Sequence, residues 1–151
     1  IMHPEFCSIF IDFVEKHKLG PNQFGLEVTE TAELADINVA SESLSFLKSK
    51  GIKIALDDFG AGYASLKYVR DLPIDVVKLD KHFTFNVSDS STARLISFVS
   101  EVCKDLELEM IGEGIETEEE KEMMLDLGCK IGQGYLMHRP DFLDSFKKKE
   151  T

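Results

Sequence analysis

The feature that most constrains the fold is a regular alternation of short apolar segments, typical of strands, with longer amphipathic segments, typical of helices. This alternation favours a parallel sheet built from βα units, with the helices packed against it. The predicted strands are 24–30, 53–57, 74–80, 109–113 and 131–135. Helices are predicted over 5–17, 37–50, 64–70, 91–106, 117–127 and, in the tail, from Asp141 onward.

Two architectures fit the alternation, a doubly wound sheet and a (β/α)8 barrel. A complete barrel normally takes about 250 residues, whereas this chain of 151 residues supplies five units. If the chain is a barrel, it is therefore a partial TIM-type barrel with about five of the eight βα units. No linker or low-complexity segment interrupts the pattern, so residues 1–151 are expected to form a single domain.

Composition and charge exclude some functions. The net charge of −11 argues against binding long nucleic acid, which requires a basic surface, but a small phosphorylated ligand could bind through divalent cations. No apolar run approaches the ~20 residues that span a bilayer, and the N-terminus lacks the pattern of a signal peptide. Three cysteines without CxxC spacing are expected to be buried thiols in a reducing compartment, so we expect a cytoplasmic protein.

Acidic residues recur where the predicted strands end, and in a parallel barrel these ends converge on the face that carries active sites. The acids are Glu27, Glu30, Asp57, Asp58, Asp80, Glu113 and Glu116, accompanied by Lys78 in the third strand and Gln133 in the fifth. One such acid can be a helix cap, but the recurrence over four consecutive units is harder to explain in that way. Converging carboxylates need protonation, a cationic partner or metal ions. One lysine cannot balance so many acids, whereas divalent cations could, and paired ions support phosphoryl hydrolysis.

A glycine-rich segment, DFGAGY, follows directly after Asp57. Two glycines around a small residue allow positive φ angles and a close approach of the backbone. The segment suits a mobile active-site loop, although a plain turn from strand to helix has the same composition. It is neither a Walker loop nor a GxGxxG motif.

Five motifs occur in the order known from one family. They are LEVTE (26–30), DDFGAGYASL (57–66), KLD (78–80), EGIET (113–117) and GQGYL (132–136), the last followed by Arg139-Pro140. They resemble the ExTE, DDFG(T/A)GYSSL, KxD, EGVET and QGYxxxxP motifs of EAL domains and cover nearly the whole chain. The chain is therefore identified as similar to EAL domains, which hydrolyse cyclic di-GMP to linear pGpG.

The resemblance implies a site for two metal ions, Mg2+ or Mn2+. By this analogy Glu27, Asp57 and Asp58 would be metal ligands, with Asp57 or Asp58 bridging both ions. Glu113 would help to hold the site, directly or through water. Such ions would lower the pKa of a water molecule and offset the charge of the phosphate.

The resemblance also implies roles for the remaining site residues. Lys78 would orient or polarise the attacking water, and among carboxylates it should stay charged, which suits electrostatic work better than service as a free base. Glu116 and Gln133 would be further site residues. Glu30 would hold the DFGAGY loop in place, and Asp80 would support Lys78.

Two parts of the family pattern are absent from this sequence. They are the Glu-Ala-Leu motif and a metal-binding asparagine on a later strand, both of which would precede Ile1. The expected domain is thus the C-terminal portion of an EAL domain, and this stretch alone is expected to be inactive or very weakly active. Five strands of an eight-stranded barrel also leave open edges, so a homodimer or a segment-swapped oligomer is expected.

Three functions stay open at this point. The first is a cyclic di-GMP phosphodiesterase, as the activity of the parent protein. The second is a non-catalytic module that binds cyclic di-GMP or another protein and acts in regulation. The third, which needs no family resemblance, is a metal-using enzyme on another α/β barrel, with Lys78 as a proton-transfer base.

Overall fold

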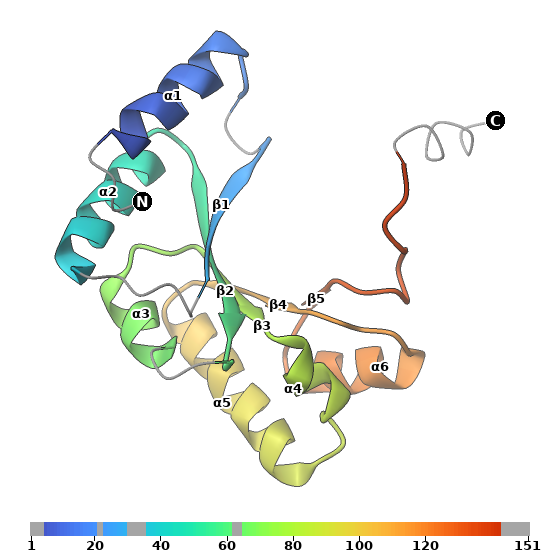
Figure 1. Cartoon of the computed structure of the whole chain (residues 1–151). Coiled ribbons are helices and arrows are strands. Elements are labelled where there is room, and N and C mark those ends of the chain that lie inside the picture. The colour runs from blue at the N-terminus through green and yellow to red at the C-terminus, as the bar shows by residue number, and fades with distance from the viewer. Residues whose placement is uncertain (1–4, 21–22, 30–35, 62–64, 143–151) are drawn as a thin grey trace.

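The computed structural model describes residues 5–20, 23–29, 36–61 and 65–142 (Figure 1). The helices are α1 (Phe6–Lys16), α2 (Ile37–Ser49), α3 (Ser65–Asp71), α4 (Lys81–Phe85), α5 (Ser90–Asp105) and α6 (Glu118–Asp126). The strands are β1 (Gly25–Thr29), β2 (Lys53–Phe59), β3 (Val76–Leu79), β4 (Glu109–Gly112) and β5 (Ile131–Gly132). Each predicted strand is confirmed, and so is each predicted helix before residue 128.

The five strands form one parallel sheet in the order β1-β2-β3-β4-β5. A doubly wound sheet would reverse its strand order at a switch point. Here every strand pairs with its successor in the chain, so the sheet winds in one direction, as a barrel does. The architecture is therefore a partial β/α barrel, and the doubly wound alternative is excluded for the described strands.

The core lies between the sheet and the helices that pack on its outer side. Alternate strand residues point to opposite faces, and on β2 the residues Ile54 and Leu56 are fully buried against the helices. Leu44 of α2 and Ile96 of α5 are also 0% exposed and belong to the same apolar cluster. The intervening strand residues point to the inner, concave side of the sheet, where Lys78 lies.

Local capping explains where several helices begin. The carboxylate of Asp36 accepts hydrogen bonds from Asn38 N and Val39 N at the start of α2. The predicted capping box at α6 is confirmed, because Thr117 Oγ1 accepts from Glu120 N while the Glu120 carboxylate accepts from Thr117 N.

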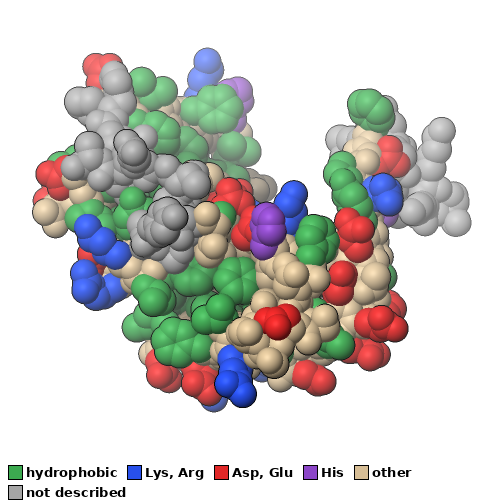
Figure 2. All heavy atoms as spheres, turned by 60° about the horizontal axis from the view of Figure 1, so that its bottom comes forward, with side chains coloured by type: hydrophobic (Ala, Val, Ile, Leu, Met, Phe, Trp, Pro, Cys, Tyr) green, Lys and Arg blue, Asp and Glu red, His purple; other side chains and the backbone are tan. Residues whose placement is uncertain are grey.

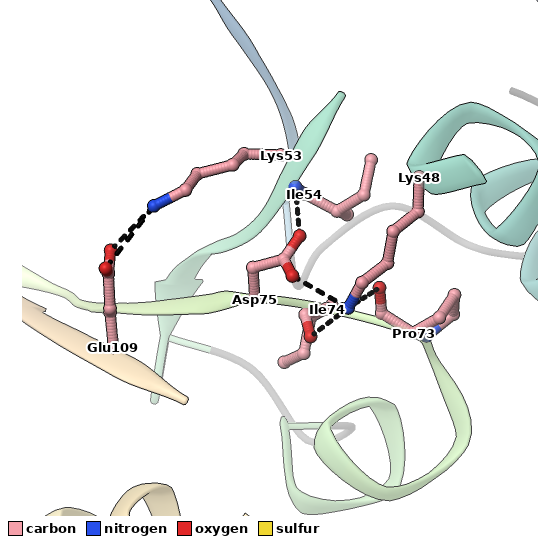
Figure 3. A network of polar contacts seen from close by, with 7 residues as sticks. All are labelled: Lys48, Lys53, Ile54, Pro73, Ile74, Asp75 and Glu109. Atoms are coloured by element: carbon pink, nitrogen blue, oxygen red, sulfur yellow. Dashed lines mark hydrogen bonds and ion pairs between the residues drawn. The ribbon is translucent and has the colours of Figure 1, made fainter. Parts of the chain in front are cut away.

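A polar network ties the sheet together at the amino ends of its strands (Figure 3). Asp75 Oδ2 accepts a hydrogen bond of 2.9 Å from Ile54 N, and Asp75 Oδ1 lies 2.7 Å from Lys48 Nζ. Lys53 Nζ lies 3.3 Å from the Glu109 carboxylate across the inner side. Asp75 therefore joins the end of α2 to the starts of β2 and β3, at the end of the sheet opposite the predicted site.

Two features differ from the sequence prediction. Helix α4 was not predicted, because five residues are too few for a helical period to be visible. Strand β2 runs two residues further than expected, to Phe59, with a shift in its pairing with β3. The predicted tail helix from Asp141 lies almost wholly outside the described residues.

Two of the three cysteines are buried, as expected. All three cysteines are free; Cys103 and Cys129 are buried, and Cys7 is half-buried. Burial raises the pKa of the Cys103 thiol to about 11, so it stays protonated at neutral pH. Within the described ranges, no helix combines the length and apolar character needed to cross a bilayer.

Candidate functional site

The centre of the site is the ammonium group of Lys78, which β3 directs to the inner side of the sheet. Its Nζ lies 2.8 Å from Asp57 Oδ1, 2.9 Å from Glu27 Oε1 and 2.9 Å from Glu113 Oε1. Glu27 lies in the middle of β1, Asp57 lies near the end of β2, and Glu113 directly follows β4. The Lys78 side chain is only 8% exposed, so this charge is held almost entirely by protein groups.

The carboxylates determine the protonation state of Lys78. Burial by itself would lower the pKa of Lys78, but the close contacts with the carboxylates of Asp57, Glu113 and Glu27 outweigh it and raise the pKa well above its ordinary range. The lysine is therefore protonated at neutral pH and has no lone pair to accept a proton. This state suits electrostatic work and argues against Lys78 as the base of a proton-transfer enzyme.

A group of three carboxylates lies beside the lysine. Asp57, Asp58 and Glu113 each place one carboxylate oxygen within 4.8 Å of the others. Burial, and then the charge of Asp57, raises the pKa of Asp58, although the charge of Lys78 lowers it. Glu27 is outside this group, on Lys78, with 53% of its side chain exposed.

The donor set of this carboxylate group fits a hard divalent cation such as Mg2+ or Mn2+. All its donors are carboxylate oxygens, which such ions prefer. Among the described residues, buried Oδ1 of Asp57 has no hydrogen bond of good geometry, although Lys78 Nζ lies 2.8 Å away as an ion-pair partner. An acceptor in this state has capacity left for a cation.

The backbone of β2 explains how two adjacent aspartates reach one point. Neighbouring strand residues normally point to opposite faces. Leu56 pairs with Val77, and Phe59 pairs with Leu79. Two residues of β2 thus lie between these pairs but only one residue of β3, so β2 carries one extra residue. Asp58 lies in this bulge with φ = +56°, a left-handed conformation that is uncommon outside glycine. The bulge thus lets Asp57 and Asp58 join the same group.

Two hollows are lined by residues of the predicted site. The larger, about 650 Å³, follows the inner side of the sheet and includes Glu27, Lys78 and Gln133 among its lining residues. The smaller, about 280 Å³, is lined by Glu113, Glu116 and Gln133 together with Lys81 and Tyr135 and three further residues. Figure 2, which brings the bottom of Figure 1 forward, shows acidic, lysine and histidine side chains gathered near the middle of the molecule. Since Gln133 is among the lining residues of both hollows, it lies between them.

Asp80 and Glu30 complete the predicted set. The Asp80 carboxylate accepts a hydrogen bond of 2.8 Å from His82 N and lies against His82 Nδ1, so it caps α4. Its predicted support of Lys78 stays a prediction. Burial would raise the pKa of Asp80, but the hydrogen bond from His82 N outweighs it and the pKa is lowered. Glu30, and Gly62 and Tyr63 of the DFGAGY segment, lie outside the described residues.

Sequence reasoning missed one residue of this region, Thr84 in α4. Its hydroxyl donates a hydrogen bond of 2.6 Å to the main-chain carbonyl of Glu113. A single threonine in a stretch without helical periodicity carries no signal of such a role. Only the position of α4 against the end of β4 shows it.

Comparison with known proteins identifies relatives for most of the chain. The EAL domain family model matches residues 1–140. The chain is 37% identical over 126 residues to the bifunctional diguanylate cyclase/cyclic di-GMP phosphodiesterase MucR of Pseudomonas aeruginosa, covering 83% of this chain and 18% of MucR. It is also 37% identical over 136 residues to the probable cyclic di-GMP phosphodiesterase PdeB of Escherichia coli, covering 87% of this chain and 26% of PdeB. The chain thus spans about a quarter or less of the length of these relatives.

Solved structures share the fold. The EAL domain of Mycobacterium smegmatis DcpA superposes with a TM-score of 0.91 at 27% identity, covering 98% of this chain and 67% of that one. A manganese and cyclic di-GMP complex of Klebsiella pneumoniae BlrP1 superposes with a TM-score of 0.81 at 30% identity, covering 89% of this chain and 35% of that one.

Proposed function

The chain belongs to the EAL domain family, and from this premise we propose that the parent protein hydrolyses cyclic di-GMP to linear pGpG, whereas this stretch alone is inactive or very weakly active. The observation that carries the proposal is the carboxylate group of Asp57, Asp58 and Glu113 beside a protonated Lys78. All four residues lie within the region that the family model matches. The names of MucR and PdeB, which describe cyclic di-GMP phosphodiesterases, support the choice of substrate.

We propose two divalent cations, Mg2+ or Mn2+, as cofactors of the reaction. Asp57, Asp58 and Glu113 would hold them, with Glu27 as a further ligand from β1. When bound, such ions offset negative charge on a phosphodiester and lower the pKa of a water molecule. The manganese in the BlrP1 complex and the oxygen donors of this chain support the assignment.

The other site residues would bind and orient the reactants. Lys78, protonated, would donate a hydrogen bond to the attacking water or to a phosphate oxygen and stabilise the charge that develops there. Glu116 and Gln133 border the smaller hollow and would contact the substrate. Glu30 would hold the DFGAGY loop, and Asp80 would support the site through the start of α4.

A second candidate function is a non-catalytic module that binds cyclic di-GMP for regulation. The observation that favours it is the number of converging donors, since three carboxylates suit one cation better than a pair. A single ion could anchor a phosphate without supplying the two-sided stabilisation that in-line hydrolysis uses.

The cellular location is part of the proposal. The three free thiols fit a reducing compartment, and we propose the cytoplasm.

The proposal is tested with the polypeptide as its gene encodes it, incubated with cyclic di-GMP and Mn2+ while pGpG is followed by chromatography. We expect turnover, and we expect Asp57→Ala to reduce it by at least about a hundredfold because a cation ligand is lost. Glu109→Gln, which changes a carboxylate at the opposite end of the sheet, is the matched control. Binding of cyclic di-GMP without pGpG would instead establish the regulatory module, and full activity of Asp57→Ala would refute the ligand assignment.

A further inference from the structure

Helix α4 lies against the carboxyl ends of both strands that supply the carboxylate group. At Gly60, at the end of β2, an added Cβ would lie 2.2 Å from the ring of Phe83. At Gly114, after β4, an added Cβ would lie 2.6 Å from Lys81 Cβ. At both positions the main chain lies so close to α4 that only glycine fits without a shift. Helix α4 therefore contacts the residues that follow β2 and β4, on either side of β3.

Thr84 makes the polar contact between α4 and β4. It is 0% exposed, and its Oγ1 donates a hydrogen bond of 2.6 Å to the carbonyl oxygen of Glu113. On the other side, Glu113 N donates to Leu79 O at 3.2 Å. The main chain of Glu113 is thus held by β3 through its N–H and by α4 through its C=O.

This arrangement matters because the carboxylate group joins two strands that are not neighbours. Asp57 and Asp58 come from β2, whereas Glu113 comes from the end of β4, with β3 between them. Beyond Leu79 and Gly112, the last pair of the β3–β4 ladder, the direction of the Glu113 side chain depends on contacts outside the ladder. A hydrogen bond that is buried and protected from water is suited to this task.

We propose that Thr84 is a positioning residue whose hydroxyl, through the Glu113 carbonyl, orients the Glu113 carboxylate for cation binding. This inference rests on the proposed function, since it takes Asp57, Asp58 and Glu113 as a cation site. Thr84 would touch neither the cation nor the substrate. Groups that orient metal ligands in this way typically change metal affinity by ten- to a hundredfold when they are removed.

The test measures Mn2+ affinity by titration calorimetry in variants that separate the hydroxyl from its size. Thr84→Val keeps the shape and removes the donor, and we expect Mn2+ to bind about tenfold more weakly. Thr84→Ser keeps the donor and should retain affinity within about twofold of wild type. If the valine variant does not fold, Thr84→Ala compared with Thr84→Ser isolates the same hydroxyl. The control is Thr92→Val, which removes a half-buried threonine hydroxyl on α5 that donates to the Asp89 carboxylate, away from the carboxylate group.

A second readout needs no metal. The amide of Gly114 shares its peptide group with the Glu113 carbonyl, so its nitrogen chemical shift should move in Thr84→Val and return in Thr84→Ser. Equal Mn2+ affinity in wild type and Thr84→Val would overturn the inference and leave the cation site standing. Absence of Mn2+ binding in the wild type would overturn the cation site itself and, with it, this role of Thr84.

Discussion

At the scale of single residues, the site contains features that oppose folding, and Asp58 combines three of them. Asp58 has a left-handed backbone, a raised pKa and a second aspartate beside it. Strained backbone and perturbed carboxylates persist where the surrounding structure enforces them, and they gather at functional sites. Replacing Asp58 by a neutral residue should therefore raise the free energy of unfolding and weaken cation binding.

Asp58→Asn is expected to stabilise the cation-free protein by roughly 0.5–2 kcal/mol, because it removes a repelled charge and asparagine tolerates a positive φ. The pKa of Asp58 is raised above its ordinary value of 3.8, so its charge opposes folding increasingly as the pH rises through the folded-state pKa. The gain should be present at pH 7 and absent below pH 3.8. Urea unfolding at both pH values measures it, with exposed Asp12→Asn on α1 as the control. Lower stability of Asp58→Asn at pH 7 would contradict the prediction.

Lys78→Met should have the opposite effect on stability. It leaves Glu27, Asp57 and Glu113 without their shared cation, and loss of one partner from a buried charge group typically costs roughly 3 kcal/mol. Because the pKa of Lys78 is raised, the contribution is complete below the ordinary lysine value of 10.5 and is lost as the pH rises through the higher folded-state pKa.

Thermal and urea unfolding measure the effect of Lys78→Met against Lys53→Met. Lys53 pairs with Glu109 at the other end of the sheet, where both side chains are about half exposed. That change should cost at most about 1 kcal/mol. Equal losses in the two variants would show that the Lys78 charge group contributes no more than a surface ion pair.

At the scale of elements, two irregular features shape the site within an otherwise regular βα pattern. The extra residue in β2 lets Asp57 and Asp58 share one group, and α4 joins the ends of β2 and β4. Both features touch the apolar core, since Phe59 is buried in it and Phe83 of α4 packs against it. Their contacts are close ones between main chain and side chain, so small substitutions there should have large local effects.

Gly60→Ala tests the contact between β2 and α4. Gly60 has φ = +97°, and its added methyl group would lie 2.2 Å from the Phe83 ring, so one of the two elements must move. We expect a loss of roughly 2 kcal/mol or more. If the clash with Phe83 is the main cause, Phe83→Leu should recover part of the loss in the Gly60→Ala background, which a double-mutant cycle would quantify. Purely additive effects would assign the loss to backbone strain alone.

At the scale of the whole molecule, the part of the chain that the structure describes leaves two edges of the sheet unpaired and a hollow on its inner side. Strands β1 and β5 each pair with one neighbour among the described strands, and a hollow of about 650 Å³ follows the concave face. Ile131 on edge strand β5 is 43% exposed. Unpaired strand edges with apolar side chains favour pairing with another chain.

The 151-residue chain is therefore expected to associate with further copies of itself, and light scattering should show a mass that rises with concentration. Ile131→Lys should weaken this association, because a lysine on an edge strand opposes pairing. Exposed Leu125→Lys on α6 is the control, since it adds the same charge away from the sheet. A concentration-independent monomer would contradict the prediction.

The sequence by itself determined the class of fold, the order of its strands and helices, and the chemical kind of the site. Hydrophobic periodicity and capping signals are local, so they can be read along the chain, as at Thr117 and Glu120. Strand-end acids such as Asp57 and Glu113 predicted convergence, because the ends of parallel strands share one face.

The tertiary structure decided which of these acids meet and what holds them. The carboxylates of Asp57, Asp58 and Glu113 lie close together, Glu27 forms an ion pair with Lys78, and Asp80 accepts a hydrogen bond from His82 N. The tertiary structure also introduced the β2 bulge, which lets Asp57 and Asp58 share one group, and α4, whose Thr84 hydroxyl donates a hydrogen bond to the Glu113 carbonyl. Such contacts depend on distances between segments that are far apart in the chain, and no local pattern encodes them, because a bulge or a buried hydroxyl is stabilised by its surroundings and not by its own residue type.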